Sequence, residues 1–352
     1  MSTSCLIASD DDASIEMVKQ SEFIWGPISD SVWQEVERLY SSVFSSKAML
    51  TIDTSSLNEL HAWQEKTHQK ISAIFLFRKQ GRVIVVANEV IRISAEEIKT
   101  FSKKIFDQFS DVRLVRFHSV ILKKPLKKIV MQSSKFSEDY ILTLKNAKEN
   151  WILSMPTRVR GKLQSYLSKA LDNKNRIQFY IYEKKDIDEK DVRDVMRLNQ
   201  SRMRKKSKTY GMTFKDENRL CEQLNRVGLV FLLKIDNEIC AGLLCSVVGK
   251  EIYLHVLAHD SSFDKLRLGL ICCLKMIDYV NAHNFQCIHF LWGHYDYKKQ
   301  LGARPIDLNR VLVIKNRSVM LMHPIMMAKW YLIKMSDTLR ALRHKSFMKI
   351  NS

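Results

Sequence analysis

Three short apolar runs follow one another between residues 229 and 258, and they constrain the fold more than any other part of the chain. The runs are "LVFLLKI", "ICAGLLCSVV" and "EIYLHVLA", and the turns between them are "DNE" and "GK". Asp-Asn and Gly-Lys between runs rich in strand-forming residues are typical of tight hairpins. We therefore predict a three-stranded antiparallel meander over these residues.

A helix and two further strands are predicted after the meander. In "LRLGLICCLKMIDYVNAH" the residues Leu266, Leu270, Cys273 and Ile277 recur at helical spacing, and Asn284 can end the helix. The runs "QCIHFLW" and "NRVLVIK" are typical of strands, and a short helix is expected in "GHYDYKKQLGARP" between them. This order of elements predicts a mixed α/β sheet with helices packed on it.

The first half of the chain repeats part of this order. "SAIFLFR" and "VIVVAN" predict a hairpin, and "SAEEIKTFSKKIFDQF" predicts a helix in which Ser94 and Glu97 form a capping box. "VRLVRFHSVI" and "DYILTL" are typical of strands, and "RIQFYIYE" between two basic helical segments predicts another. Either the fold is duplicated with one degenerate copy, or both halves reached a similar α/β pattern independently.

The charge of the chain is uneven. Residues 1–60 hold ten acidic and three basic residues, which gives this segment a net charge of −7. Because the whole chain has a net charge of +19, the remaining residues carry +26. A field of this sign attracts nucleic acid, an anionic membrane surface or a phosphorylated ligand. The length of 352 residues suits two domains.

Cysteine usage and the absence of two sequence signals indicate the compartment. The seven cysteines are odd in number, lie mostly in apolar runs and lack metal-ligand spacing, which favours reduced thiols and no metal site. The first residues lack a signal-peptide pattern, and no run of about 18 apolar residues exists. We expect a cytoplasmic protein.

Two stretches, "IYLHVLAHDSSFDKLRLG" and "HFLWGHYDYKKQLGA", carry a family resemblance. They resemble the CelD/BcsL group of the GNAT superfamily of N-acyltransferases, whose tandem layout is similar to that of FemAB-like aminoacyl transferases. The resemblance covers about residues 155–315. The positions that match its pattern are His259-Asp260, Gly269, Gly293 and Tyr297-Lys298. The positions that depart from it are Arg267-Leu268, His289 and Trp292.

The resemblance implies tandem GNAT-like domains, with a degenerate copy in residues 1–150, the transferase domain in 151–320 and a basic helical tail in 321–352. It also implies that acetyl-CoA or another acyl-CoA enters where two neighbouring strands splay apart, with its pyrophosphate at the start of the next helix. Free N–H groups and the helix dipole favour an anion there. The expected cofactor-binding residues are Ala258, Lys265, Arg267, Leu268, Gly269, Leu270 and Gly293.

Acyl transfer to an amine needs a polarised thioester and a proton for the departing thiolate. Tyr297 is the expected acid, with a pKa between that of the thiol and its own usual value, although packing against the sheet would explain it equally. Lys298 could lower that pKa, bind a phosphate or be a solvated helix lysine. His259 or Asp260 is the expected base. In a regular strand His255 shares a face with His259, so the two could pair.

The expected acceptor is an amine, for which the resemblance implies an amino sugar, such as a nucleotide-linked one, in bacterial cell-surface polysaccharide biosynthesis. One alternative is a FemAB-like enzyme that uses aminoacyl-tRNA, which a basic chain suits; another is a non-catalytic binding protein with a transferase fold. The basic segment from Arg202 to Lys208 could contact an acidic or lipid-phosphate acceptor, but an exposed loop after a helix is the favoured interpretation. The basic tail could lie on the inner surface of an anionic membrane or dock on its own domain.

Overall fold

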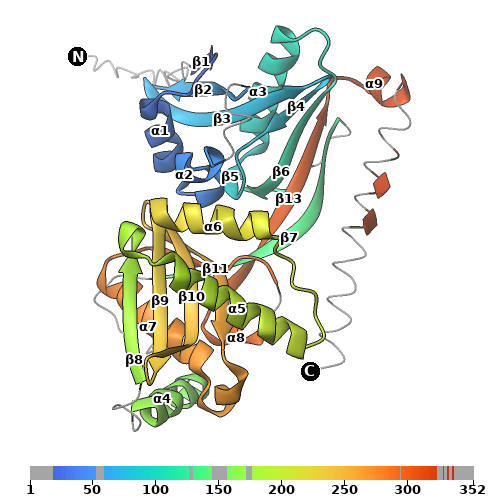
Figure 1. Ribbon diagram of the computed structural model, residues 1–352. Coiled ribbons are helices and arrows are strands. Elements are labelled where there is room, and N and C mark those ends of the chain that lie inside the picture. Colours follow the sequence, from blue (N-terminus) through green and yellow to red (C-terminus); the bar gives the residue numbers. More distant parts are fainter. Residues whose placement is uncertain are drawn as a thin grey trace, which may run out of the picture.

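The computed structural model describes residues 19–52, 59–126, 130–144, 157–171, 177–293 and 295–322, together with 328, 331, 332, 335 and 336. Within these residues one mixed sheet runs through two lobes, with helices on both of its faces (Figure 1). The strand order is β1-β2-β3-β4-β6-β13-β7-β12-β11-β10-β9-β8, and β5 pairs with β6 beside this path. Most of the predicted tail, 321–352, lies outside the described residues.

The first half of the chain supplies the elements up to β7. They are β1 (Lys19–Ile24), α1 (Asp30–Tyr40), the 3₁₀ helix η1 (Val43–Ser45), α2 (Lys47–Leu50), β2 (His61–Thr67), β3 (Lys70–Gln80), β4 (Val83–Val86), β5 (Ile91–Ile93), α3 (Ala95–Gln108), β6 (Leu114–Leu122) and β7 (Met131–Thr143).

The second half begins at α4. Its elements are α4 (Thr157–Leu171), β8 (Ile177–Glu183), η4 (Lys184–Asp186), α5 (Glu189–Lys205), α6 (Phe214–Val227), β9 (Gly228–Ile235), β10 (Glu238–Val248), β11 (Glu251–His259), η5 (Ser261–Leu266), α7 (Leu268–Ala282), β12 (Cys287–His289), α8 (Asp296–Gln300), β13 (Arg304–Ile314) and α9 (Arg317–Met322). The predicted meander, the helix after it and the strands on either side of α8 are confirmed.

The two halves share one topology. Apart from α4, which precedes β8 in the second half, each has a strand (β1 or β8), then helices (α1 and α2, or α5 and α6) and then an antiparallel meander (β2-β3-β4 or β9-β10-β11). A helix then leads to a strand parallel to the last meander strand: α3 leads to β6, which pairs with β4, and α7 leads to β12, which pairs with β11. The prediction of a mixed α/β fold built from two similar halves is confirmed.

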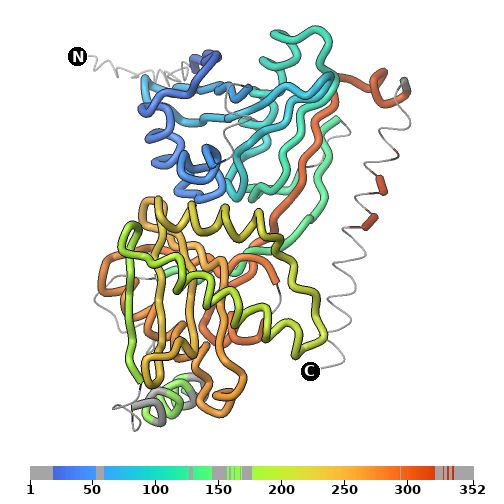
Figure 2. Tube along the Cα trace, in the orientation of Figure 1, coloured from blue at the N-terminus to red at the C-terminus, as the bar shows by residue number. Residues whose placement is uncertain are grey.

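Each half gives its final strand to the other. Strand β7 of the first half pairs with β12 through residues 141–143, and β13 of the second half pairs with β6. The two exchanged strands also pair with each other from Arg304↔Ile141 to Val313↔Met131, and they lie side by side between the lobes in Figure 2. Residues 304–314, predicted as part of the second domain, therefore pack against the first half, where Val311 and Val313 join its core.

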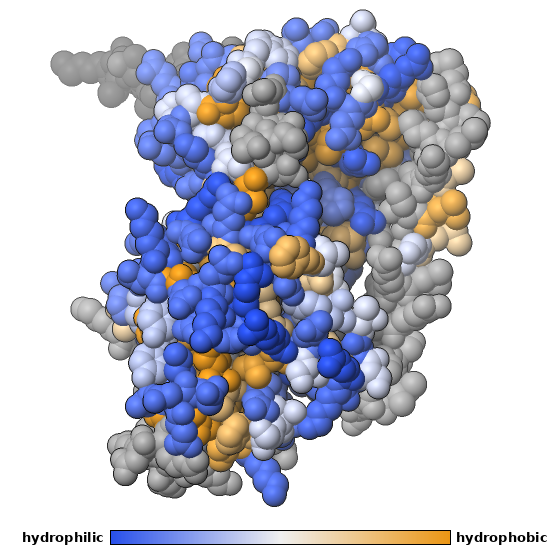
Figure 3. All heavy atoms as spheres, in the orientation of Figure 1, coloured by the Kyte–Doolittle hydropathy of each residue, from blue (hydrophilic) through white to orange (hydrophobic). Residues whose placement is uncertain are grey.

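Helices cover both faces of the sheet in each half. In the second half α7 packs on one face of β9–β11, and α5 and α6 pack on the other. This explains the continuous apolar run of β10, because a strand buried on both faces has no solvent side. At Gly242 an added Cβ would lie 2.4 Å from Val195, so glycine allows α5 to approach the sheet. The outer surface of α5 and α6 is mostly hydrophilic (Figure 3).

Two further predictions concern the side chains and the helices. All six cysteines in the described part of the chain are free thiols, as predicted, and five of them are buried. Among the described helices, none has both the length and the hydropathy that crossing a bilayer requires.

Candidate active site

Strands β11 and β12 separate soon after they pair. Their register holds only Glu251↔Cys287, Ile252↔Ile288 and Tyr253↔His289, whereas β11 continues to His259. On the side of β12, residues 254–259 have no partner strand in the described part of the sheet. Beyond β12 the chain turns toward β7, where Phe290 N–H donates to the Tyr140 carbonyl at 2.8 Å. Free backbone groups on such an edge can bind an extended ligand.

A β-bulge in β11 overturns the predicted pairing of His255 with His259. The register passes from Leu244↔Val256 to Cys245↔Leu254, so His255 is the extra residue. A bulge changes the direction of the side chains that follow it. His255 contacts Gln223 of α6 at 3.1 Å and Ser246 at 3.0 Å, whereas His259 lies against α7 on the other face of the sheet.

A cavity of about 630 Å³ lies at the end of β11, between the last turn of α5 and the start of α7. Five of its lining side chains are basic and one is a carboxylate. The lining residues are Tyr166, Arg202, Lys205, Lys206, His259, Ser261, Asp264, Lys265 and Arg267. The basic segment is exposed from Arg204 to Lys208, as expected, but it is helical as far as Lys205 and not a loop there. Three of its side chains, Arg202, Lys205 and Lys206, line the cavity.

The start of α7, where the cofactor is predicted to bind, lies at this cavity. Arg267 is the N-cap residue of α7, has a positive φ of 55° and makes no side-chain cap hydrogen bond. At Gly269 an added Cβ would lie 2.9 Å from His259 Nδ1, so only glycine fits without moving the imidazole. Leu268 is buried, so it can contact a ligand mainly through its backbone. Leu270 packs on the core and its N–H already donates to the Arg267 carbonyl at 2.9 Å, so it offers a ligand no backbone donor.

The remaining residues predicted at the strand end have different surroundings. Ala258 is buried against α5, which again leaves its backbone. The Asp260 carboxylate accepts from Ser262 N–H at 2.8 Å and caps η5. Hydrogen bonding to Ser262, from its side chain first and its backbone second, lowers the pKa of Asp260. A carboxylate engaged in this way is a weak base, so of the two proposed bases His259 is better placed.

His259 has one engaged and one unengaged ring nitrogen. Nε2 lies 3.1 Å from Asp264 Oδ1, and the buried Nδ1 has no hydrogen-bond partner among the described residues. Burial lowers the pKa of His259, the charge of Arg202 lowers it further, and Asp264 opposes both effects. The imidazole is therefore neutral near pH 7, the form that can accept a proton.

Tyr297 lies on α8 with its ring against the core, edge-on to Phe290 at 6.1 Å. Burial raises its pKa above the usual tyrosine value, and the charge of Arg202 acts in the opposite direction. The expectation of a pKa below the usual value is therefore wrong for the protein without a ligand. Within the described residues no hydrogen bond to its hydroxyl is present, so that group is available to a ligand.

Lys298 is neither solvated nor free to bind a phosphate. Its side chain is 1% exposed, and Nζ donates to the carbonyls of Leu291 at 2.9 Å and Trp292 at 2.8 Å. Burial lowers the pKa of Lys298 to about 8. Leu291 has a φ of 54°, a strained conformation for a leucine, so the buried ammonium stabilises an unusual turn. The proposed phosphate-binding and solvated alternatives are both corrected.

That turn presents an exposed tryptophan. Trp292 is 53% exposed, and its ring lies 5.7 Å from that of Phe44, which comes from the first half. Gly293 has a φ of 97°, and an added Cβ would lie 2.9 Å from the Tyr295 ring, so both conformation and space require glycine. Phe44 was missed from the sequence because nothing near it in the chain marks a contact with residue 292.

His289, a departure from the family pattern, lies in a buried ionic network. Nδ1 is 2.5 Å from Asp139 of β7, and Nε2 is 2.7 Å from Glu251 of β11. Burial lowers the pKa of His289, but the two carboxylates outweigh burial and raise it to about 9. A protonated His289 thus connects the exchanged strand to the second half. Sequence reasoning missed Asp139, which is 150 residues away.

Comparisons with known proteins concern the sequence of the second half and the fold of the chain. Residues 158–299 match the family described as "Acetyltransferase (GNAT) domain". The crystal structure of FemX is similar at a TM-score of 0.59 and 12% identity, covering 87% of this chain and 99% of that one. The structure of L-PGS from Bacillus licheniformis gives a TM-score of 0.49 at 12% identity, covering 85% and 95%. No curated protein matches the sequence. Residues 158–299 thus match a GNAT acetyltransferase domain, and the chain shares its overall fold with FemX.

Proposed function

We propose that this protein is an N-acyltransferase that moves an acyl group from an acyl-coenzyme A, with acetyl-CoA as the first candidate, to an amine. The observation that carries the proposal is the unpaired edge of β11, which ends at a cavity lined by five basic side chains. An extended, strand-like thioester arm followed by phosphates has the shape and charge that this pair of features accommodates.

The donor would add to β11 through backbone hydrogen bonds along residues 254–259. Its pyrophosphate would then lie in the cavity, near Lys265, Arg267 and the backbone amides of Leu268 and Gly269 at the start of α7. A helix N-terminus and two cations both stabilise a doubly charged group. Gly269 supports this arrangement because it keeps His259 close to α7.

The chemical step uses His259 and Tyr297. The amine nitrogen attacks the thioester carbonyl carbon, so that a C–N bond forms and the C–S bond breaks. His259 accepts the proton that the amine loses, and Tyr297 donates a proton to the departing thiolate. Because burial keeps Tyr297 protonated near neutral pH, its hydroxyl can donate as charge develops on sulfur.

The acceptor is proposed to be an amino sugar, such as a nucleotide-linked one used in bacterial cell-surface polysaccharide biosynthesis, as the CelD/BcsL resemblance implies. The exposed ring of Trp292, beside the partly buried ring of Phe44, provides an aromatic surface near α8 against which a sugar ring could stack. Contact of the basic tail with an anionic membrane stays a prediction, because the tail lies mostly outside the described residues.

A second candidate is a FemAB-like transferase whose donor is an aminoacyl-tRNA. The basic cavity favours it, because such a lining would suit a nucleic-acid phosphate as well as a coenzyme. Calorimetric titration separates the two: acetyl-CoA should bind in the micromolar to low millimolar range, and no binding at millimolar ligand would exclude the acyl-CoA enzyme. A tRNA that binds where acetyl-CoA does not would favour the second candidate, and binding of neither would favour a non-catalytic protein.

Tyr297→Phe tests the chemistry once an acceptor has been found by a thiol-release screen of amino sugars. We expect turnover to fall by about 100-fold or more, the usual range for a general acid. Acetyl-CoA affinity should stay within about twofold because the ring still packs on the core. Parallel losses of turnover, affinity and melting temperature would show instead that Tyr297 is structural.

A further inference from the structure

We infer that the cavity binds two separate phosphate groups of the donor, and that the end of α5 binds the 3′-phosphate of coenzyme A. The inference rests on the proposed function and names the part of the donor that the enzyme selects. Its site is the cluster formed by Arg202, Lys205 and Lys206, which we call the α5 cluster. It predicts that the enzyme discriminates coenzyme A from coenzymes that lack this phosphate.

The charge of the cavity exceeds what a pyrophosphate needs. Five basic side chains and Asp264 line it, which gives a net charge of +4 when His259 is neutral. A pyrophosphate diester carries about −2, and a phosphomonoester adds about −2 near neutral pH. In the described part of the chain, no carboxylate forms an ion pair with any of the five cations. Asp264, the carboxylate that lines the cavity, is paired with His259 instead. A ligand with both groups would balance the cavity.

The cations lie on two different walls. Lys265 and Arg267 come from the segment that leads into α7, and the α5 cluster comes from a helix about 60 residues earlier. Lys205 Nζ donates to Ser261 Oγ at 3.0 Å, so the end of α5 reaches across to the α7 side. A ligand at the start of α7 therefore lies next to the α5 cluster, and its second phosphate can contact that wall.

The α5 cluster is crowded with like charge. Burial lowers the pKa of Lys206, and the charges of Arg202 and Lys208 lower it further. Arg202 Nε is buried without a hydrogen-bond partner among the described residues. The dipole of α5 favours cations in its last turn, but it would favour them equally if they pointed into solvent. An anion in the cavity accounts for both the crowding and the unpartnered donor.

The test compares acetyl-CoA with acetyl-3′-dephospho-CoA by calorimetry on the full-length protein. Hydrogen bonds to a charged group are each strong enough to give about tenfold in affinity, so the wild type should bind acetyl-CoA at least about tenfold more tightly. The double variant Lys205→Ala/Lys206→Ala should lose this preference by weakening acetyl-CoA alone. Lys103→Ala/Lys104→Ala, a pair of exposed neighbouring lysines on α3, removes the same charge elsewhere and should keep the preference.

Each outcome separates this inference from the proposed function. Equal affinity of the wild type for both ligands would overturn the inference while leaving the acyl-CoA enzyme intact. A preference that survives in Lys205→Ala/Lys206→Ala would place the 3′-phosphate elsewhere and would also overturn it. Binding of neither ligand would remove the proposed function and the inference together. Raising the salt concentration should narrow the wild-type preference, because a partly exposed phosphate contact is screened.

Discussion

The two halves of the molecule have the same topology but treat the gap between their parallel strands differently. In the second half β11 leaves β12 after Tyr253, and no described strand fills the gap. In the first half β4 pairs with β6 only up to Val85, and β5 then pairs with the continuation of β6 through Ile91–Ile93. The first half therefore closes the edge along which a strand-like ligand could bind.

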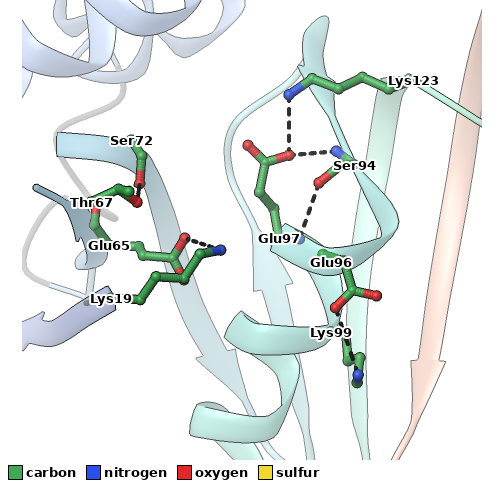
Figure 4. Close-up of polar contacts among 9 residues, drawn as sticks. All are labelled: Lys19, Glu65, Thr67, Ser72, Ser94, Glu96, Glu97, Lys99 and Lys123. Carbon is green, nitrogen blue, oxygen red and sulfur yellow. Dashed lines mark hydrogen bonds and ion pairs between the residues drawn. The ribbon is translucent and has the colours of Figure 1, made fainter. Parts of the chain in front are cut away.

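The helices that follow these strands differ in the same sense. At the start of α3, Ser94 accepts from Glu97 N–H, Glu97 accepts from Ser94 N–H, and Lys123 lies 3.4 Å from the Glu97 carboxylate (Figure 4). At the start of α7, no side chain caps the helix and its first turn has no acidic residue. The first copy thus satisfies its helix terminus with its own carboxylate, whereas the second leaves the terminus facing a basic cavity. The first half therefore lacks both the open strand edge and the uncapped helix start that the proposed donor site uses.

The largest expected effect concerns the network that joins the two halves. His289→Gln leaves Asp139 and Glu251 without their shared cation, and breaking a buried ion pair on one side costs about 3–5 kcal/mol. We expect a loss of that size in the free energy of unfolding, measured by urea titration at pH 6. His283→Gln, at an exposed histidine whose ring stacks on Tyr279 of α7, is the control and should change stability by less than about 1 kcal/mol.

The pH dependence gives an independent readout. The pKa of His289 is raised to about 9 in the folded state, so the protonated network makes its full contribution to the free energy of unfolding at pH values below 6.5, the ordinary histidine pKa. Its contribution should fall as the pH rises from 6.5 through 9. The wild type should therefore lose stability over this range relative to His289→Gln. If the difference in free energy of unfolding between wild type and His289→Gln stays constant from pH 6 to 9.5, His289 is not charged in the folded protein.

The fold of each half was predictable because its signals are local. Two-residue turns define the meander, and the Ser94 capping box defines the start of α3. The exchange of β7 and β13 could not be predicted in this way, since pairing between residues 141 and 304 leaves no local pattern. Strand β7 reads "MQSSKFSEDYILT", and its polar first part hid more than half of its length.

The candidate site was predictable where its residues are close in sequence. Gly269, Lys265 and Arg267 lie at the cavity because they surround the start of one helix. The end of α5 was misjudged because only the packed sheet brings it to that helix. The face of His255 was misjudged because one bulged residue reverses the alternation of a strand. The burial of Lys298 has no sequence signal, since its partners are backbone carbonyls.

A second prediction tests the effect of placing a carboxylate at the start of α7, where the first half has Glu97 at the start of α3. Leu270 is the third residue of α7, as Glu97 is of α3, so Leu270→Glu places a carboxylate at the helix start. Like charges in contact cost several kcal/mol, and acetyl-CoA affinity should therefore fall by about a hundredfold. Leu270→Gln is the matched control, because glutamine has nearly the same size and shape as glutamate but carries no charge. An equal loss in both variants would assign the effect to lost packing on the core instead of to the phosphate.

The smallest expected effect comes from removing the cap in the first half. Ser94→Ala deletes the hydroxyl that accepts from Glu97 N–H at 3.2 Å, and loss of such a cap costs about 1 kcal/mol. Acetyl-CoA affinity should not change, because in this half β5 closes the gap and Glu97 already occupies the helix start. Urea unfolding and calorimetry on the same variant measure the two quantities. If the cap serves stability alone, only the free energy of unfolding will change. A change in acetyl-CoA affinity would mean that the first half still takes part in the site.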